Sequence, residues 1–327
     1  MTGAGGTTPV VVVTGFLGSG KTTALAHLLR DPRLENSAVI VNEFGEVGLD
    51  HGLMEVIDRD IVLLPQGCVC CALSGDLAAT LEKLSLQRAT GDVPAFERVI
   101  LETTGLADPA PVIQTILERS MVLCGYRLGS VLTTVDTVNA SRTLERHSEA
   151  RRQVAVADRL FLTKTDLADR EKIDAVSREL RRLNPLAPIQ MIAHGAIDPA
   201  WILAAEHDDV ALPAPGRGRD GAFGHAAQPS TLVVRFDEPV PYAALSAWMG
   251  HLVGNHGERL LRVKGVVAVT EQRQPIAIHG VQHLFHPPRI LNAWPAGVSS
   301  STIVMILDGV DPGAIRSSAP DYGLQPA

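Results

Sequence analysis

The sequence predicts an α/β protein in which a domain with a mostly parallel sheet precedes a smaller α+β domain. Three observations predict this fold. Apolar strand-like segments alternate with helical segments through about residue 205, a stretch rich in Gly, Pro and Ala then interrupts the pattern, and strand-like segments dominate the remainder. Alternating strands and helices imply crossover connections, which produce a parallel sheet covered by helices. At 327 residues the chain is long enough for two domains.

The first domain, which we place at residues 1–211, shows strands and helices in regular succession. Short apolar runs are typical of buried parallel strands, and apolar residues three and four apart are typical of helices. We expect strands at residues 10–14, 38–42, 61–64, 98–102, 130–135, 159–163 and 188–192. We expect helices at residues 22–29, 75–88, 110–117, 145–157 and 171–183.

Residues 212–230 lack apolar periodicity, and their composition predicts a flexible linker. The second domain then occupies residues 231–310, and residues 311–327 are expected to form a loose tail. Within the second domain we expect a helix at residues 242–253 and strands at residues 231–236, 259–269, 275–285 and 301–307.

A phosphate-binding loop is predicted at residues 15–22, which read GFLGSGKT and directly follow the apolar run at residues 10–13. A strand that enters such a loop and continues into a helix surrounds phosphates with backbone N–H donors at the positive end of a helix dipole. Lys21 is expected to reach the β- and γ-phosphates, and the Thr22 hydroxyl to ligate Mg²⁺. The other positions expected to contact the nucleotide are Gly15, Gly18, Ser19, Gly20 and Thr23.

A second nucleotide-handling element follows the apolar strand at residues 98–102, which ends in Glu102 and is followed by Gly105. The spacing is similar to the DxxG element of GTPases, with Glu in place of Asp. A carboxylate at the end of a strand can hold Mg²⁺ through water, and the N–H of the glycine can contact the γ-phosphate. We therefore expect Glu102 and Gly105 to face the phosphates.

A guanine-binding element is predicted where residues 160–166 read LFLTKTD, which matches NKxD with Thr163 in place of Asn. The Asp166 carboxylate suits the paired donors of guanine, and the Lys164 stem can lie along the base, so the pattern favours GTP over ATP. The loss of Asn removes one base contact and some bracing of the loop. The strand ending near residue 192 is expected to bring His194 close to the base.

A cluster of thiols distinguishes the chain from ordinary GTPases: Cys68, Cys70 and Cys71 lie within GCVCC at residues 67–71. Thiolates are soft ligands that suit Zn²⁺, Co²⁺ or Cu(I) better than Mg²⁺. Because three cysteines leave one position of a tetrahedral site unfilled, the binding is expected to be reversible. Candidate fourth ligands are Glu43, Glu46, His51 and His194, and a redox pair is the competing explanation for the thiols.

Composition and charge narrow the class of partner. The net charge is −7 without a basic stripe, which argues against nucleic acid. No apolar run approaches the ~18–20 residues needed to span a bilayer. The first residues lack the basic and apolar regions of a signal peptide. We therefore expect a cytoplasmic protein.

With these motifs in place, the chain resembles the CobW-type metallochaperone GTPases, and most closely their YjiA-like subgroup. The resemblance covers nearly the whole chain and depends on TGFLGSGKTT at 14–23, VNEFGEVGLD at 41–50, GCVCC at 67–71, LETTGLADP at 101–109, ADRLFLTKTD at 157–166, RVKGV at 262–266 and HGVQHLFHPP at 279–288. It implies a GTPase domain with a CobW C-terminal domain and slow hydrolysis of GTP. It also implies binding of Zn²⁺ or a similar ion by the thiols, delivery to a client metalloprotein, and a possible nucleotide-dependent homodimer.

The resemblance also implies roles for individual residues. Cys68, Cys70 and Cys71 correspond to the metal-binding thiols. Glu43 and Glu46 fall in a switch segment near both metal and γ-phosphate, so we assign the catalytic roles to Lys21, Glu102 and Glu46. One departure is Val41, where many relatives have Glu. In this interpretation GTP draws residues 43–50 inward and thereby rearranges the thiols.

Two other classes of function remain open on the sequence. A small-molecule kinase would use the same phosphate loop with an arginine-bearing lid, for which Arg151 and Arg152 are weak candidates. A metal buffer or interaction module would retain only a vestigial GTPase. Metal-dependent turnover of GTP would count against the buffer.

Overall fold

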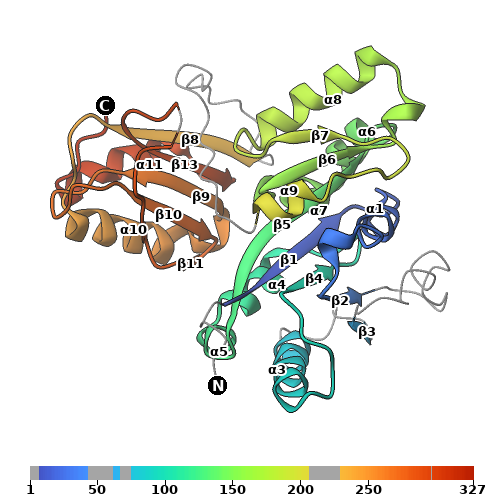
Figure 1. The fold of residues 1–327 in the computed structure, drawn as a ribbon. Helices are drawn as coiled ribbons and strands as arrows, with labels where there is room; N and C mark the ends of the chain where they lie inside the picture. Colours follow the sequence, from blue (N-terminus) through green and yellow to red (C-terminus); the bar gives the residue numbers. More distant parts are fainter. Residues whose placement is uncertain (1–6, 43–61, 67–74, 206–228, 296) are drawn as a thin grey trace. The chain divides into compact units, whose positions relative to one another are not determined.

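The computed structural model describes residues 7–42, 62–66, 75–205, 229–295 and 297–327 (Figure 1). The chain divides into two compact units, Met1–Glu179 with Ala187–Asp209, and Leu180–Leu186 with Val210–Ala327. Each unit is built around one sheet, so the α/β class with a second α+β domain is confirmed. None of the described helices combines the length and the apolar character needed to cross a membrane.

The first unit contains a seven-stranded parallel sheet. Its strands are β1 Thr8–Gly15, β2 Ser37–Asn42, β3 Val62–Gln66, β4 Arg98–Glu102, β5 Tyr126–Asp136, β6 Arg159–Thr163 and β7 Ile189–Met191. They lie in the order β3-β2-β4-β1-β5-β6-β7, so β1 is central and its residues are all buried. Parallel strands all end at one edge of the sheet, and β1, β4, β5 and β6 therefore bring their carboxyl ends together.

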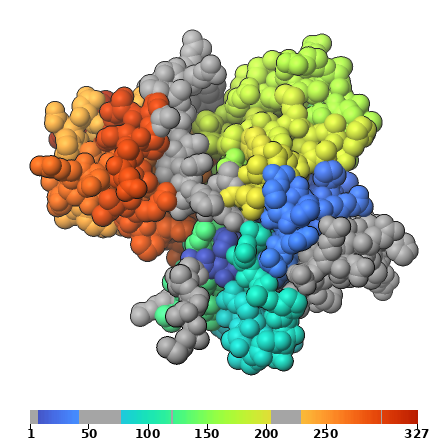
Figure 2. Space-filling view, in the orientation of Figure 1, coloured from blue at the N-terminus to red at the C-terminus, as the bar shows by residue number. Residues whose placement is uncertain are grey.

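Helices cover this sheet, as a parallel sheet buried on both faces requires. They are α1 Lys21–Leu28, α3 Gly75–Thr90, α4 Ala110–Leu117, α5 Arg119–Leu123, α6 Ala140–Arg146, α7 Ser148–Val156, α8 Arg170–Leu183 and α9 Ala200–Ala205, with short 3₁₀ turns at Pro32–Leu34 and Thr165–Leu167. On the face shown in Figure 2, α1, α3 and α9 (blue, cyan and yellow) form much of the surface of the unit. Apolar side chains of α1 and α9, such as Leu25 and Ile202, pack with Val11 and Ile100 of the sheet.

The bounds of the helix expected at residues 145–157 were wrong. Residues 145–146 are the end of α6, and residues 148–156 form a separate helix, α7. His147 separates them in an extended conformation, with φ −120° and ψ 115°. Its ring lies 4.4 Å from the ring of Phe16 in the phosphate-binding loop. The break therefore places a side chain of this connection against the nucleotide-binding edge of the sheet.

The second unit contains a six-stranded antiparallel sheet in the described residues. Its elements are β8 Pro229–Phe236, α10 Tyr242–His256, a 3₁₀ turn at Gly257–Arg259, β9 Leu260–Val267, β10 Ile276–Val281, β11 Leu284–Phe285, β12 Arg289–Ile290 and β13 Ser301–Asp308. The strand order is β11-β10-β9-β13-β8, with β12 paired to β10. Trp248 of α10 is fully buried and packs edge-on against Phe236.

Two expectations for this unit need correction. The segment at 275–285 is a hairpin of β10 and β11, turned at Gln282 with a positive φ of 53°. Residues 311–327 are not a loose tail: they form α11 Pro312–Ser318 and a 3₁₀ turn at Ala319–Tyr322, and they bury Ile315 and Leu324 in the core. Of the expected linker, residues 229–230 belong to β8, and residues 212–228 lie outside the described residues.

Candidate functional site

The phosphate-binding loop connects the end of β1 to the start of α1. Gly18 and Gly20 have positive φ of 70° and 88°, a conformation that suits glycine, and Gly20 is the N-cap residue that directly precedes α1. At Gly15 a Cβ atom would collide with Thr134 of β5. The glycines of the motif are therefore needed to form this loop.

The side chains expected to handle phosphate and Mg²⁺ meet at this loop. The Lys21 ammonium donates to the carbonyl oxygens of Gly15 at 2.9 Å and Phe16 at 3.3 Å. The Thr22 hydroxyl donates to Oε1 of Glu102 at 2.8 Å, which joins α1 to the end of β4. Glu102 is only 4% exposed, and oxygen ligands of this kind suit Mg²⁺. The structure thus brings together the hydroxyl and carboxylate that the sequence pairs.

The loop that follows β4 lies directly on the phosphate-binding loop. A Cβ atom built on Gly105 would stand 2.7 Å from the backbone nitrogen of Leu17, so there is room for glycine alone. The start of the loop is fixed because the Thr103 N–H donates to the carbonyl of Val13 at 2.9 Å, and its hydroxyl donates to that of Thr14 at 2.8 Å. Gly105 therefore lies directly against the phosphate-binding loop.

Thr163 corrects one expectation about the guanine-binding element. Its hydroxyl contacts the Ser19 carbonyl oxygen at 2.8 Å and the Val135 carbonyl oxygen at 3.1 Å, and the residue is 4% exposed. The threonine therefore ties the end of β6 to the phosphate-binding loop. The loss of Asn was expected to remove some bracing of the loop. In the structure the Thr163 hydroxyl supplies this bracing.

Lys164 adds a second tie to the same loop, and it identifies a residue that sequence reasoning missed. Its ammonium donates to the carbonyl of Gly18 at 2.8 Å and to Oδ2 of Asp136 at 2.9 Å. Burial by itself raises the pKa of Asp136, but hydrogen bonds from Lys164, Asn139 and a backbone N–H outweigh it and hold the pKa below its ordinary value. The available signal was a carboxylate directly after the expected strand at 130–135.

The loops expected at the base also meet. The Asp166 carboxylate accepts from the His194 backbone N–H at 3.3 Å, and its Oδ2 lies 3.6 Å from the His194 ring nitrogen Nδ1. The Thr165 hydroxyl donates to the carbonyl of Ile192 at 3.0 Å. These contacts join the ends of β6 and β7, the two loops that the sequence predicts beside the guanine base.

This position argues against His194 as a fourth ligand for the cysteine site of the same chain. His194 contacts Asp166 beside β6, whereas the cysteine motif follows β3, five strands away in the sheet. Five spacings of about 4.8 Å amount to about 24 Å. Two residues of chain, from Gln66 to Cys68, span at most about 7 Å. Two residues of chain do not bridge this distance, so a ligand at position 68 and His194 are not expected to bind one ion.

The cysteines Cys68, Cys70 and Cys71, together with Glu43, Glu46 and His51, lie outside the described residues. The points where their segments leave the sheet are described: Asn42 and Gln66 are register partners at the ends of β2 and β3. Val41 is the register partner of Glu102 on β4. Among the described residues, no group of three His, Cys, Asp or Glu side chains could hold a metal.

Val41 occupies the position at which the family resemblance implies a Glu in many relatives. It is 5% exposed and packs in the core of the first unit. An apolar side chain at this position supplies no metal ligand.

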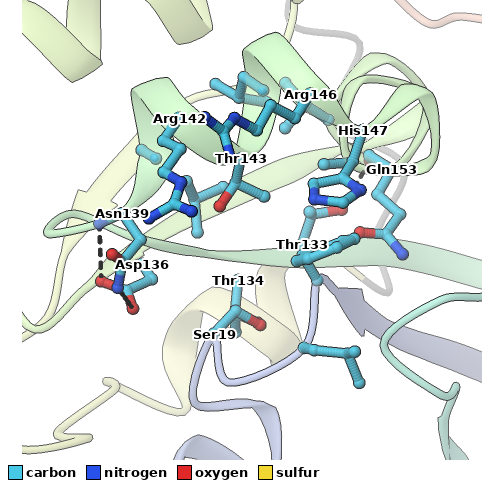
Figure 3. A pocket seen from close by; sticks show the side chains of 17 residues that line it. Ser19, Thr133, Thr134, Asp136, Asn139, Arg142, Thr143, Arg146, His147 and Gln153 are labelled. Atoms are coloured by element: carbon cyan, nitrogen blue, oxygen red, sulfur yellow. Dashed lines mark hydrogen bonds between the residues drawn. The ribbon is translucent and has the colours of Figure 1, made fainter.

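A cavity of about 270 Å³ adjoins the phosphate-binding loop (Figure 3). Ser19 and Thr134 lie on one side, Asp136 and Asn139 on another, and His147 and Gln153 of the α6–α7 region on a third. The cavity separates α6 from the phosphate-binding loop.

A parallel sheet with these loops at its carboxyl edge defines a P-loop nucleotide-binding protein. Residues 9–191 match the family described as CobW/HypB/UreG, nucleotide-binding domain, and residues 230–319 match the cobalamin synthesis protein cobW C-terminal domain. The chain therefore belongs to the CobW family, and the resemblance found in its motifs is confirmed.

Several characterised relatives are similar over most of their length. The Escherichia coli K12 protein "Zinc chaperone YjiA" is 34% identical over 284 residues, covering 84% of this chain and 86% of the relative. The Pseudomonas aeruginosa protein "Zinc chaperone CobW" is 30% identical over 348 residues, covering 94% and 90%. The crystal structure of Zn(II)-bound YjiA GTPase from E. coli aligns with a TM-score of 0.77 at 29% identity, covering 98% of this chain and 99% of that one.

Proposed function

We propose that this protein is a GTP-hydrolysing metallochaperone that binds Zn²⁺ or a similar ion through Cys68, Cys70 and Cys71 and delivers it to a client protein. The observation that carries the proposal is the pairing of Asn42 with Gln66 next to the strand that ends in Glu102. The NEFGE and GCVCC segments therefore leave from two adjacent strands, β2 and β3, and β2 lies beside β4, which ends in Glu102. Names of relatives that refer to zinc chaperones support the same function.

For GTP hydrolysis, Lys21 would leave the loop carbonyls that it contacts and bind the β- and γ-phosphates. Thr22 and Glu102 would hold Mg²⁺, which neutralises charge on those phosphates when bound. Gly105 would donate its N–H to the γ-phosphate, and Asp166 would select guanine. Glu46 is a proposed participant. We expect turnover to be slow, as in GTPases that act without an activating partner.

Coupling of nucleotide to metal follows from the strand order. A γ-phosphate that orders residues after Asn42 acts on a segment that starts beside Gln66, two residues before Cys68. We propose that this ordering changes the spacing of the thiols and that hydrolysis releases the ion to the client. Such order–disorder switching by γ-phosphate is a general property of nucleotide switches. A nucleotide-dependent homodimer remains a prediction.

The contacts of Arg151 and Arg152 do not support the kinase alternative, which needs an arginine-bearing lid. The Arg151 guanidinium donates to the carbonyls of Leu144 at 2.6 Å and Glu145 at 3.2 Å, and Arg152 pairs with Asp108 at 3.1 Å. Both side chains therefore contact the body of the domain instead of a mobile lid.

A matched pair of cysteine variants tests the metal site. Cys70→Ala is expected to reduce the thiolate-to-Co²⁺ charge-transfer absorption and to weaken Zn²⁺ binding at least about tenfold, with GDP affinity unchanged. Cys124→Ala is the control, because Cys124 is a free thiol half-buried after α5. If Cys70→Ala bound Zn²⁺ as tightly as the control, the GCVCC thiols would not be the metal site.

A further inference from the structure

We infer that Gln153, on α7, is a positioning residue for GTP hydrolysis whose side-chain amide holds the loop carrying Gly105 against the phosphate-binding loop. The inference rests on the proposed contact between Gly105 and the γ-phosphate. It concerns a residue that lies outside every nucleotide motif in the sequence.

The Gln153 amide has partners that fix its orientation. Its nitrogen donates to the carbonyl oxygens of Gly105 at 3.1 Å and Ala107 at 2.9 Å, and the residue is 1% exposed. Both neighbours are acceptors, so the NH₂ group must face them. The amide oxygen has no hydrogen-bond partner among the described residues, so the loop alone sets the orientation. Figure 3 shows Gln153 on the cavity wall near His147.

A second contact between α7 and this loop is more exposed. Arg152 pairs with Oδ2 of Asp108 at 3.1 Å, with the two side chains 42% and 27% exposed. The other oxygen of Asp108 accepts from the N–H of Ala110, the first residue of α4. Exposed ion pairs contribute little because water and salt screen them. The buried amide of Gln153 is therefore the main link between α7 and the loop.

The loop is held from both sides. On one side is the Gln153 amide, and on the other the backbone of Leu17 lies so close to Gly105 that no side chain would fit between them. A loop released from α7 would be free to move away from the phosphate-binding loop. Because a diphosphate has no γ-phosphate, this release would affect GTP-specific properties and leave GDP binding intact.

The test uses Gln153→Met, which keeps the length of the side chain and removes both donors, with Gln87→Met on α3 as the matched control. For the full-length protein, kcat and KM for GTP are measured together with affinities for GDP and a non-hydrolysable GTP analogue. For Gln153→Met we expect kcat to fall about tenfold. The preference for the analogue over GDP should fall by a similar factor, with GDP affinity within about twofold of wild type.

A second variant, Gln153→Glu, distinguishes positioning from folding. Its carboxylate would face two carbonyl oxygens, and burial would favour the protonated form, which recovers one donor. We expect its kcat relative to wild type to rise as pH falls. A kcat for Gln153→Met within about twofold of the control, or GDP and analogue affinities that fall together, would overturn the inference. Absence of turnover in the wild type would instead refute the proposed function, and the analogue-to-GDP ratio would still test the role of Gln153.

Discussion

Replacing Thr163 by Val measures how strongly the guanine-binding element braces the phosphate-binding loop. The substitution nearly preserves shape but removes the hydroxyl, which bonds to Ser19 O at 2.8 Å and Val135 O at 3.1 Å. The single hydroxyl proton can serve only one of these two carbonyls fully at a time, and its removal leaves a buried acceptor unpaired. Because that costs about 1–3 kcal/mol, the free energy of unfolding should fall by about 2 kcal/mol. The bond to Ser19 belongs to the loop itself. About 1 kcal/mol should therefore also appear as a roughly fivefold weaker affinity for GDP.

Urea unfolding and calorimetric titration with GDP measure the two effects of Thr163→Val. Thr163→Ser is the control, since it keeps the hydroxyl and removes one methyl group, at a cost of about 0.8 kcal/mol. We expect the serine variant to retain wild-type GDP affinity within about twofold. The reasoning would be refuted by a valine variant whose unfolding free energy and GDP affinity both match those of the serine variant.

Three further predictions address other parts of the structure. Gly105→Ala would place a Cβ 2.7 Å from Leu17 backbone atoms, so a steady-state assay should show loss of GTP hydrolysis while GDP still binds; wild-type turnover would contradict this. The pKa of Asp136 is lowered in the folded protein, so the carboxylate contributes its full stabilisation of the fold above the ordinary pKa of 3.8 and loses it as pH falls through the native pKa. The free energies of urea unfolding of Asp136→Asn and wild type should therefore converge in acid. A difference that stays constant with pH would refute this prediction. Ile315→Ala should cost about 2–5 kcal/mol by urea unfolding, whereas a free tail would cost nothing.

The fold of the first unit could be predicted because its signals are local. The strands at 98–102 and 159–163 have the predicted bounds, since apolar runs end there in polar motif residues. The break at His147 was not predicted; in the structure the His147 ring contacts the ring of Phe16, which is distant in sequence. The helix at Pro312–Ser318 was missed because its single buried face, around Ile315, is too short to show periodicity.

The sequence predicted those residues of the candidate site whose expected role follows from a single local motif. Lys21, Thr22, Glu102 and Asp166 all lie at the carboxyl edge of the sheet, as their positions at strand ends imply. The roles of Asp136 and Gln153 were not visible, since each acts through a partner from another element. The strand order also separates His194 from the strand that leads to the cysteines, and sequence alone does not give that order.

The central claim is that nucleotide state controls metal affinity, and one titration tests it most directly. Reduced wild-type protein is titrated with Zn²⁺ against a competing chelator, once with GDP bound and once with a non-hydrolysable GTP analogue. We predict Zn²⁺ affinities that differ at least about tenfold between the two states, a coupling of about 1.4 kcal/mol. Equal affinities in both states would contradict a GTP-driven chaperone and favour a metal buffer.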